Sequence, residues 1–184
     1  MYYEKRRSGF IKRSGLGLTH IYYGNGVGKT TRAIGLAIRA AGVGYNVVFV
    51  QFMKSGNSGE AIAFAGIPNI QYFCPGRHRF ILSKGPELAH YQHALKGLRY
   101  TLEAVNKKVQ LVICDEILNT LLFGLLKKKQ IMDLIAQCTG RIELVMTGRT
   151  APKELLDMAD YASEMRQVKH PYYQGTKARL GIEF

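Results

Sequence analysis

The stretch Gly24-Asn25-Gly26-Val27-Gly28-Lys29-Thr30-Thr31 decides the fold of this 184-residue chain. It lies between a strand-like run, residues 19–23, and a helix-like run, residues 31–41. Its glycines let the backbone curl closely around a ligand, and the helix that follows directs unpaired N–H groups at an anion. Strand, glycine-rich turn, Lys-Thr and helix together predict a nucleoside triphosphate site. The alternative is a glycine-rich turn in front of a well-capped helix.

The loop is one residue shorter than the usual phosphate-binding pattern. That pattern is a glycine, four further residues, and then Gly-Lys-Ser/Thr. It would place the first glycine at position 23, where this chain has Tyr23, and the glycine comes one step later at Gly24. A bound triphosphate therefore need not run through this loop in the usual direction.

A magnesium site is predicted beside the loop. Lys29 can reach phosphate oxygens as a point charge, Thr30 can offer its hydroxyl to Mg²⁺, and Thr31 can add a hydroxyl to a phosphate. The apolar run that begins at residue 111 ends in Asp115 and Glu116. Mg²⁺ prefers oxygen ligands, so Thr30, Asp115 and Glu116 are the candidate metal ligands. In the alternative, Asp115 caps the following helix and Glu116 faces solvent.

Strand-like and helix-like segments alternate along the chain. The predicted strands are residues 20–23, 47–52, 70–74, 110–115 and 142–147, and the predicted helices are residues 30–41, 60–65, 86–106, 117–126, 130–137 and 152–158. Several of the strands are almost entirely apolar, as strands buried on both faces are. This predicts an α/β, doubly wound, mainly parallel sheet with helices on both faces, in the P-loop NTPase (RecA-like) class. Ligands of such sheets bind beyond the carboxyl ends of the strands.

Composition indicates one cytoplasmic domain. Residues 1–17 form a basic arm and residues 18–184 a single domain, with no apolar run near the roughly 20 residues that span a bilayer. The three cysteines lack metal-ligand spacing. The net charge of +13 attracts polyanions, but the basic clusters resemble solvated faces and helix ends, so nucleic acid is not the expected main partner.

Four further residues are candidates because of their positions. Gln51 and Lys54 follow the second predicted strand, whose end should open onto the same cleft. Arg149 follows the last predicted strand and either steadies substrate charge or is an ordinary loop cation. Arg39 lies eleven residues beyond Gly28, too far to touch the phosphates within one subunit. It is either a surface charge or a contact across a subunit boundary.

Seven segments resemble the ATP:corrinoid adenosyltransferases of the cobalamin-biosynthesis type. They are residues 23–31, which include the missing first glycine, and residues 50–56, 112–116, 147–149, 157–164, 168–170 and 175–184. The resemblance runs from about residue 18 to the end of the chain. Members of this family carry Gly-Phe-Thr-Trp after the third strand. This chain instead has His78-Arg79-Phe80-Ile81-Leu82 there, and it contains no tryptophan.

The resemblance implies a homodimeric enzyme that moves the 5′-deoxyadenosyl group of ATP onto the cobalt(I) of a corrinoid and releases triphosphate, in adenosylcobalamin synthesis or salvage. It implies Mg²⁺ as cofactor and an electron-donating reductase, a flavoprotein, as partner. The implied catalytic residues are Lys29, Thr30 and Glu116. The implied ATP-binding residues are Gly24, Asn25, Gly26, Val27, Gly28, Lys29, Thr30, Thr31, Arg39 and Arg149. The implied corrinoid contacts are Gln51, Lys54 and Phe80.

Two other function classes fit a phosphate-binding loop. A P-loop ATPase or kinase would act at the γ-phosphate and release ADP. A binding module would leave ATP unchanged. The products formed from ATP and a reduced corrinoid distinguish the three classes.

Overall fold

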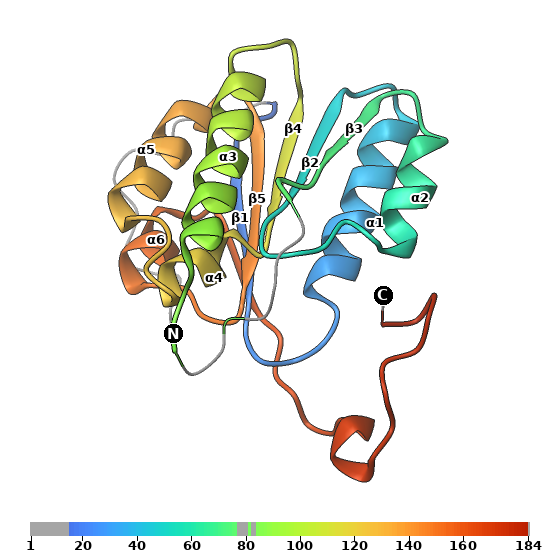
Figure 1. The fold of residues 1–184 in the computed structure, drawn as a ribbon. Coiled ribbons are helices and arrows are strands. Elements are labelled where there is room, and N and C mark those ends of the chain that lie inside the picture. The colour runs from blue at the N-terminus through green and yellow to red at the C-terminus, as the bar shows by residue number, and fades with distance from the viewer. Residues whose placement is uncertain (1–14, 77–80, 82–83, 184) are drawn as a thin grey trace, which may run out of the picture.

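A computed structural model describes residues 15–76, 81 and 84–183, which form one six-stranded sheet with flanking helices (Figure 1). The strands are β1 (Thr19–Tyr23), β2 (Val47–Gln51), β3 (Ile70–Phe73), β4 (Leu111–Asp115), β5 (Glu143–Gly148) and β6 (Tyr161–Glu164). Their order is β3-β2-β4-β5-β1-β6, and every neighbouring pair is parallel. The predicted parallel α/β sheet is confirmed. Most of the predicted basic arm lies outside the described residues.

Helices cover both faces of the sheet, as predicted. The helices α1 (Lys29–Gly42) and α2 (Gly59–Ala65) lie on one face, and α3 (Leu88–Val105), α4 (Ile117–Leu122), α5 (Lys128–Cys138) and α6 (Lys153–Met158) lie on the other (Figure 1). The prediction of a helix over residues 117–126 was wrong in its second half. The chain turns at Gly124, whose φ is 65°, a left-handed conformation that ends a helix.

Two apolar layers pack against the sheet. Along β2, Val48 and Val50 join the layer beneath α3–α6, whereas Val47 and Phe49 join the layer beneath α1 and α2. Neighbouring side chains of a strand point to opposite faces, so a strand with helices on both sides must be apolar at every position. This two-sided burial explains the continuous apolar runs in the sequence.

The edge strand β6 is the element that the sequence pattern does not reveal. It pairs with β1, and three of its four residues are exposed. An exposed edge strand needs no apolar run, and residues 161–164 (Tyr-Ala-Ser-Glu) have none. The strand nevertheless brings Met165 next to the glycine-rich loop.

The C-terminal segment extends away from the sheet (Figure 1). Between β6 and residue 183 the regular element is a short 3-10 helix, η1 (Pro171–Gln174), and residues 171–183 are all exposed. Its exposed side chains include large apolar ones, with Tyr173 78% and Ile182 69% exposed. Exposure of large apolar side chains to water is energetically unfavourable, so this segment would gain stability if another surface covered it.

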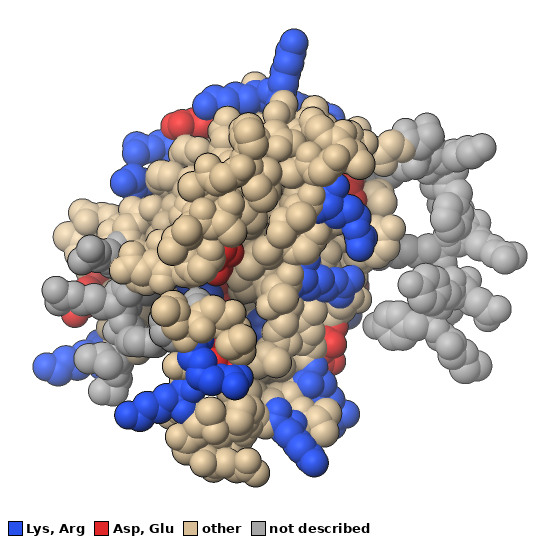
Figure 2. Space-filling view, turned by 90° about the vertical axis from the view of Figure 1, so that its right-hand side faces the viewer, with Lys and Arg blue, Asp and Glu red and all other residues tan. Residues whose placement is uncertain are grey.

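Positive side chains dominate the side of the molecule formed by α1, α2 and the C-terminal segment, where Figure 2 shows many more blue than red groups. The net charge of +13 accounts for this excess. No helix in the described part of the chain has the length and apolar character needed to cross a membrane.

Candidate functional site

The glycine-rich loop lies at the carboxyl edge of the sheet, directly after β1. Gly24 has a φ of 113°, and its N–H donates to the carbonyl of Arg149 at 3.0 Å. The N–H of Gly26 donates to the carbonyl of Met165 at 2.7 Å. A Cβ atom would lie 2.4 Å from the Met165 carbonyl oxygen if added at Gly24, and 2.8 Å from it if added at Gly26. The loop is therefore wedged between the ends of β5 and β6, which only glycine allows.

These contacts limit which backbone groups can bind phosphate. The N–H groups of Gly24 and Gly26 already have protein acceptors, and the Asn25 side chain accepts a bond from the N–H of Gln167 at 3.1 Å. The end of the loop and the first turn of α1 supply further N–H groups that can bind an anion. An anion at that position also interacts favourably with the helix dipole.

Lys29 folds back into the loop. Its Nζ donates to the carbonyl oxygens of Gly24 at 2.8 Å and of Gly26 at 2.6 Å. Burial lowers the pKa of Lys29, while the nearby Glu116 carboxylate acts to raise it. A phosphate that enters the loop would replace the two carbonyl acceptors of this ammonium group.

The carboxylate of Asp115, fully buried at the end of β4, is the centre of the site. Thr30 Oγ1 donates to its two oxygens at 3.0 and 3.1 Å. The structure therefore brings together the loop threonine and the strand-end carboxylate that the sequence placed at one site. Thr147 Oγ1 donates to Oδ1 at 2.7 Å, and Gln51 Nε2 donates to Oδ2 at 3.2 Å. The alternative in which Asp115 caps the next helix is excluded, because Glu116 is the N-cap residue of α4.

Glu116 does not face open solvent, contrary to the alternative considered above. Its φ of 62° is a left-handed conformation that is costly for a residue other than glycine. Its carboxylate accepts a bond from Asn119 Nδ2. Burial raises the pKa of Glu116, the Asp115 charge raises it further, and Lys54, Lys29 and Arg149 act to lower it.

Asn119 is a site residue that the sequence analysis missed. Its Nδ2 bonds Glu116, and its Oδ1 accepts the N–H of Arg149 at 2.7 Å. The close approach of α4 to β5 depends on Gly148, where a Cβ would lie 2.5 Å from the Cβ of Leu118. An asparagine three residues after the acidic pair, on the same helical face, is the signal that could have identified it.

The remaining predicted residues fall into three groups. Lys54 and Arg149 both act to lower the pKa of Glu116, so their charges lie close enough to be felt by this carboxylate. Arg39 is exposed in the last turn of α1, about 15 Å along the helix from Lys29, so its own subunit does not bring it to the loop. Phe80 lies outside the described residues.

The residues around Asp115 fit Mg²⁺. The hydroxyl of Thr30 and the carboxylates of Asp115 and Glu116 are hard oxygen donors. Within the described ranges there is no cluster of three or more His, Cys, Asp or Glu side chains suited to a metal. Mg²⁺ characteristically binds through one or two carboxylates together with substrate phosphates, and does not need a complete protein cage.

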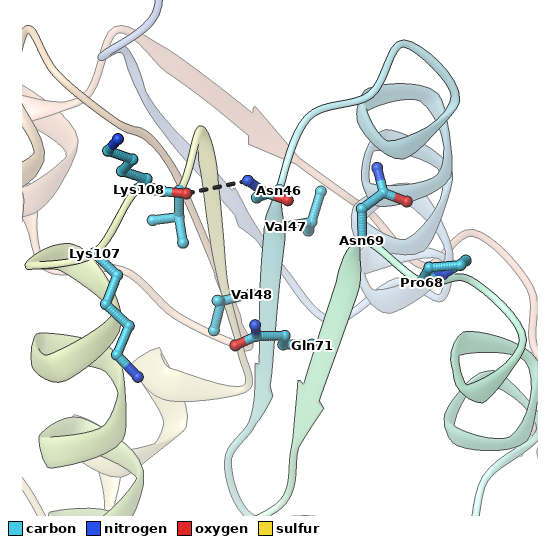
Figure 3. Close-up of a pocket in the computed structure, with 9 residues that line it drawn as sticks. Asn46, Val47, Val48, Pro68, Asn69, Gln71, Lys107 and Lys108 are labelled. Atoms are coloured by element: carbon cyan, nitrogen blue, oxygen red, sulfur yellow. Dashed lines mark hydrogen bonds between the residues drawn. The ribbon is translucent and has the colours of Figure 1, made fainter.

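A hollow at the opposite edge of the sheet does not belong to this site. It has a volume of about 160 Å³, lies at the amino ends of β2 and β3, and contains the bond from Asn46 Nδ2 to the Lys108 carbonyl at 3.2 Å (Figure 3). Pockets for small ligands are usually about 300–1,000 Å³. Its size and its distance from the loop exclude it as the nucleotide site.

Replacement of Gly26 by alanine should weaken ATP binding about tenfold or more. The added Cβ would press on the Met165 carbonyl, and such overpacking costs about 1–3 kcal/mol. Gly35→Ala is the matched control, because no atom lies within 4 Å of its Cβ position. Within α1 it should raise stability by about 0.5–1 kcal/mol. Calorimetric titration with ATP checks the prediction, which fails if the two variants bind equally.

Known proteins resemble this chain over most of its length. A family model described as "ATP:corrinoid adenosyltransferase BtuR/CobO/CobP" matches residues 15–184. The chain is 30% identical to the corrinoid adenosyltransferase CobA of Salmonella typhimurium, over 91% of this chain and 86% of that protein. It is 31% identical to a corrinoid adenosyltransferase of Pseudomonas aeruginosa, over 91% of this chain and 84% of that protein. With its shortened loop facing a buried aspartate, this chain belongs to the ATP:corrinoid adenosyltransferase family.

Proposed function

We propose that this protein transfers the 5′-deoxyadenosyl group of ATP to the cobalt(I) of a corrinoid and releases triphosphate, using the loop and the carboxylates described above. The observation that carries the proposal is the contact between Thr30, at the end of the loop, and Asp115, at the end of β4. This contact joins the proposed phosphate-binding loop to the proposed metal-binding carboxylate, in a chain of the adenosyltransferase family.

In this reaction the main tasks of the protein are to align the reacting atoms and to stabilise the charge on the leaving triphosphate. Cobalt(I) is itself the nucleophile at the ribose C5′, so no general base is required. Correct alignment of cobalt, C5′ and the leaving oxygen can lower the barrier by about 7–11 kcal/mol. Lys29 and the N–H groups at the start of α1 stabilise the charge that gathers on the departing triphosphate.

We propose Mg²⁺ as the cofactor, held by Thr30, Asp115 and Glu116 together with phosphate oxygens. When bound, it supplies positive charge to the triphosphate leaving group. The two adjacent carboxylates and their burial support this proposal. Arg149 adjoins the same carboxylates, and we assign its guanidinium to the nucleotide.

The corrinoid is expected above the carboxyl edge of the sheet, beside the ribose of ATP. Lys54 remains a candidate contact because its positive charge acts on the pKa of Glu116. Phe80 remains the candidate aromatic contact from the sequence pattern alone. Gln51 is fully buried and bonds Asp115, so we assign it to the carboxylate and not to the corrin.

We propose a homodimer in the cytoplasm, supplied with electrons by a reductase, for which a flavoprotein is the expected type. The exposed apolar residues of the C-terminal segment support a partner subunit that covers them. A second subunit would also give Arg39 a nucleotide to contact. The free thiols of Cys74, Cys114 and Cys138 suit a reducing compartment.

Product analysis tests the function directly. The protein is mixed with ATP, a corrinoid and a strong chemical reductant, in the dark. We expect triphosphate and a corrinoid whose new cobalt–carbon bond is cleaved by light, in equal amounts. ADP and phosphate would instead indicate an ATPase or kinase, and unchanged ATP a binding module. Either result would refute the proposal.

A further inference from the structure

A chain of hydrogen bonds leads from the edge of the sheet to Asp115. Gln51 ends β2, between β3 and β4, and is fully buried. Its Nε2 donates to Glu60 Oε1 at 2.7 Å and to Asp115 Oδ2 at 3.2 Å. Its Oε1 accepts a bond from the hydroxyl of Tyr72 at 2.7 Å. Both ends of the amide are therefore in use.

The two carboxylates and Tyr72 together determine which way this amide points. Burial raises the pKa of Tyr72 well above its ordinary value, so at neutral pH the phenol keeps its proton and can donate it. The carboxylates accept only, so the NH₂ group of Gln51 faces them, and its amide oxygen then faces Tyr72, whose hydroxyl donates to it. The reversed amide would place its oxygen against two negative charges, which is strongly unfavourable in a buried site.

This arrangement gives each oxygen of Asp115 an anchor besides Thr30. Thr147 holds Oδ1 at 2.7 Å, and Gln51 holds Oδ2 at 3.2 Å. A metal ion bound to the Thr30 oxygen would compete with the hydrogen bonds from Thr30 to Asp115, so other groups must keep the carboxylate oriented. Thr147 and Gln51 can still do so.

We propose that Tyr72 acts through Gln51 as a positioning residue that orients the Asp115 carboxylate for Mg²⁺. In this role both side chains act on the carboxylate and not on substrate. Glu60, in the first turn of α2, holds the second hydrogen of the Gln51 amide and so links α2 to the same carboxylate. The inference rests on the proposed magnesium site at Asp115.

The test is Tyr72→Phe, which removes the hydroxyl and keeps the ring against Phe49 and Phe64. Outer-shell partners of metal ligands typically change metal affinity about 10–100-fold. We expect the Mg²⁺ concentration for half-maximal adenosylation to rise about tenfold. ATP binding by calorimetry, without corrinoid, should weaken in Mg²⁺ and stay at the wild-type level in EDTA.

Two comparisons separate positioning from general damage. Tyr161→Phe removes a hydroxyl from a ring stacked on His20, at the amino end of β6, and should leave both measurements unchanged. Gln51→Met should raise the Mg²⁺ requirement at least as much as Tyr72→Phe. If Tyr72 acts through Gln51, adding Tyr72→Phe to Gln51→Met has little further effect.

Three results would overturn the inference. One is a wild-type Mg²⁺ requirement in Tyr72→Phe or in Gln51→Met. Another is equal weakening of ATP binding in Mg²⁺ and in EDTA, which would indicate a structural role alone. A wild-type protein whose ATP binding and turnover ignore Mg²⁺ would instead refute the magnesium site itself, so the two failures are distinguishable.

Discussion

Replacement of Lys29 by alanine should reduce turnover by about 10²–10³-fold or more, the usual effect of removing a group that stabilises transition-state charge. Lys29 is the cation of the loop, and its ammonium group lies 2.8 and 2.6 Å from the carbonyl oxygens of Gly24 and Gly26. The triphosphate carries more charge as it leaves than it does in ATP. Loss of Lys29 should therefore lower kcat more than it weakens ATP binding.

Lys107→Ala is the control for Lys29→Ala. Lys107 is an exposed lysine at the opposite edge of the sheet, next to the hollow in Figure 3, so the control removes the same charge far from the loop. Initial rates of triphosphate release, with saturating corrinoid and reductant, give the comparison. Rates near wild type in folded Lys29→Ala protein would remove Lys29 from the mechanism.

Replacement of Glu116 by glutamine should lower activity and raise stability. As a proposed metal ligand, Glu116 should affect the Mg²⁺ requirement more than an outer-shell residue does, so we expect an increase of more than about 100-fold. Its bond from Asn119 can be kept by the glutamine oxygen. An unchanged magnesium requirement would show that Glu116 does not bind the metal.

The stability gain follows from the raised pKa of Glu116. Burial and the Asp115 charge make the folded protein bind this proton more tightly than the unfolded chain does. The free energy of unfolding therefore falls as pH rises from the ordinary carboxyl pKa of 4.5 through the raised value, and the loss is complete above it. Glu116→Gln avoids this loss at neutral pH.

Thermal unfolding in EDTA measures this effect. Glu116→Gln should unfold at a higher Tm than wild type at neutral pH, by roughly 2–4 °C for each kcal/mol gained. The difference should shrink as pH falls toward 4.5. Glu103→Gln, an exposed carboxylate on α3, should show no such gain. A lower Tm for Glu116→Gln at neutral pH would contradict the sign of the argument.

The parallel sheet, five of its six strands and the glycine-rich loop were predictable from residue patterns alone. Strands such as β2 and β4 are recognisable because burial on both faces requires apolar residues throughout. The loop is recognisable because close backbone packing at Gly24 and Gly26 excludes every other residue. The pairing of Thr30 with Asp115 follows from the same local patterns, because both lie where a strand ends and a helix begins.

The hydrogen bonds that support the carboxylates depend on how the strands are arranged in space. The order β3-β2-β4-β5 brings Tyr72, Gln51, Asp115 and Thr147 together from four strands. Periodicity along a chain tells which face of a strand is buried, but strand order and register decide which strand ends become neighbours. For the same reason the edge strand β6 and its contact with the loop were not predictable. The strand β6 is stabilised by pairing with β1, and because its side chains are mostly exposed, its sequence shows no apolar pattern.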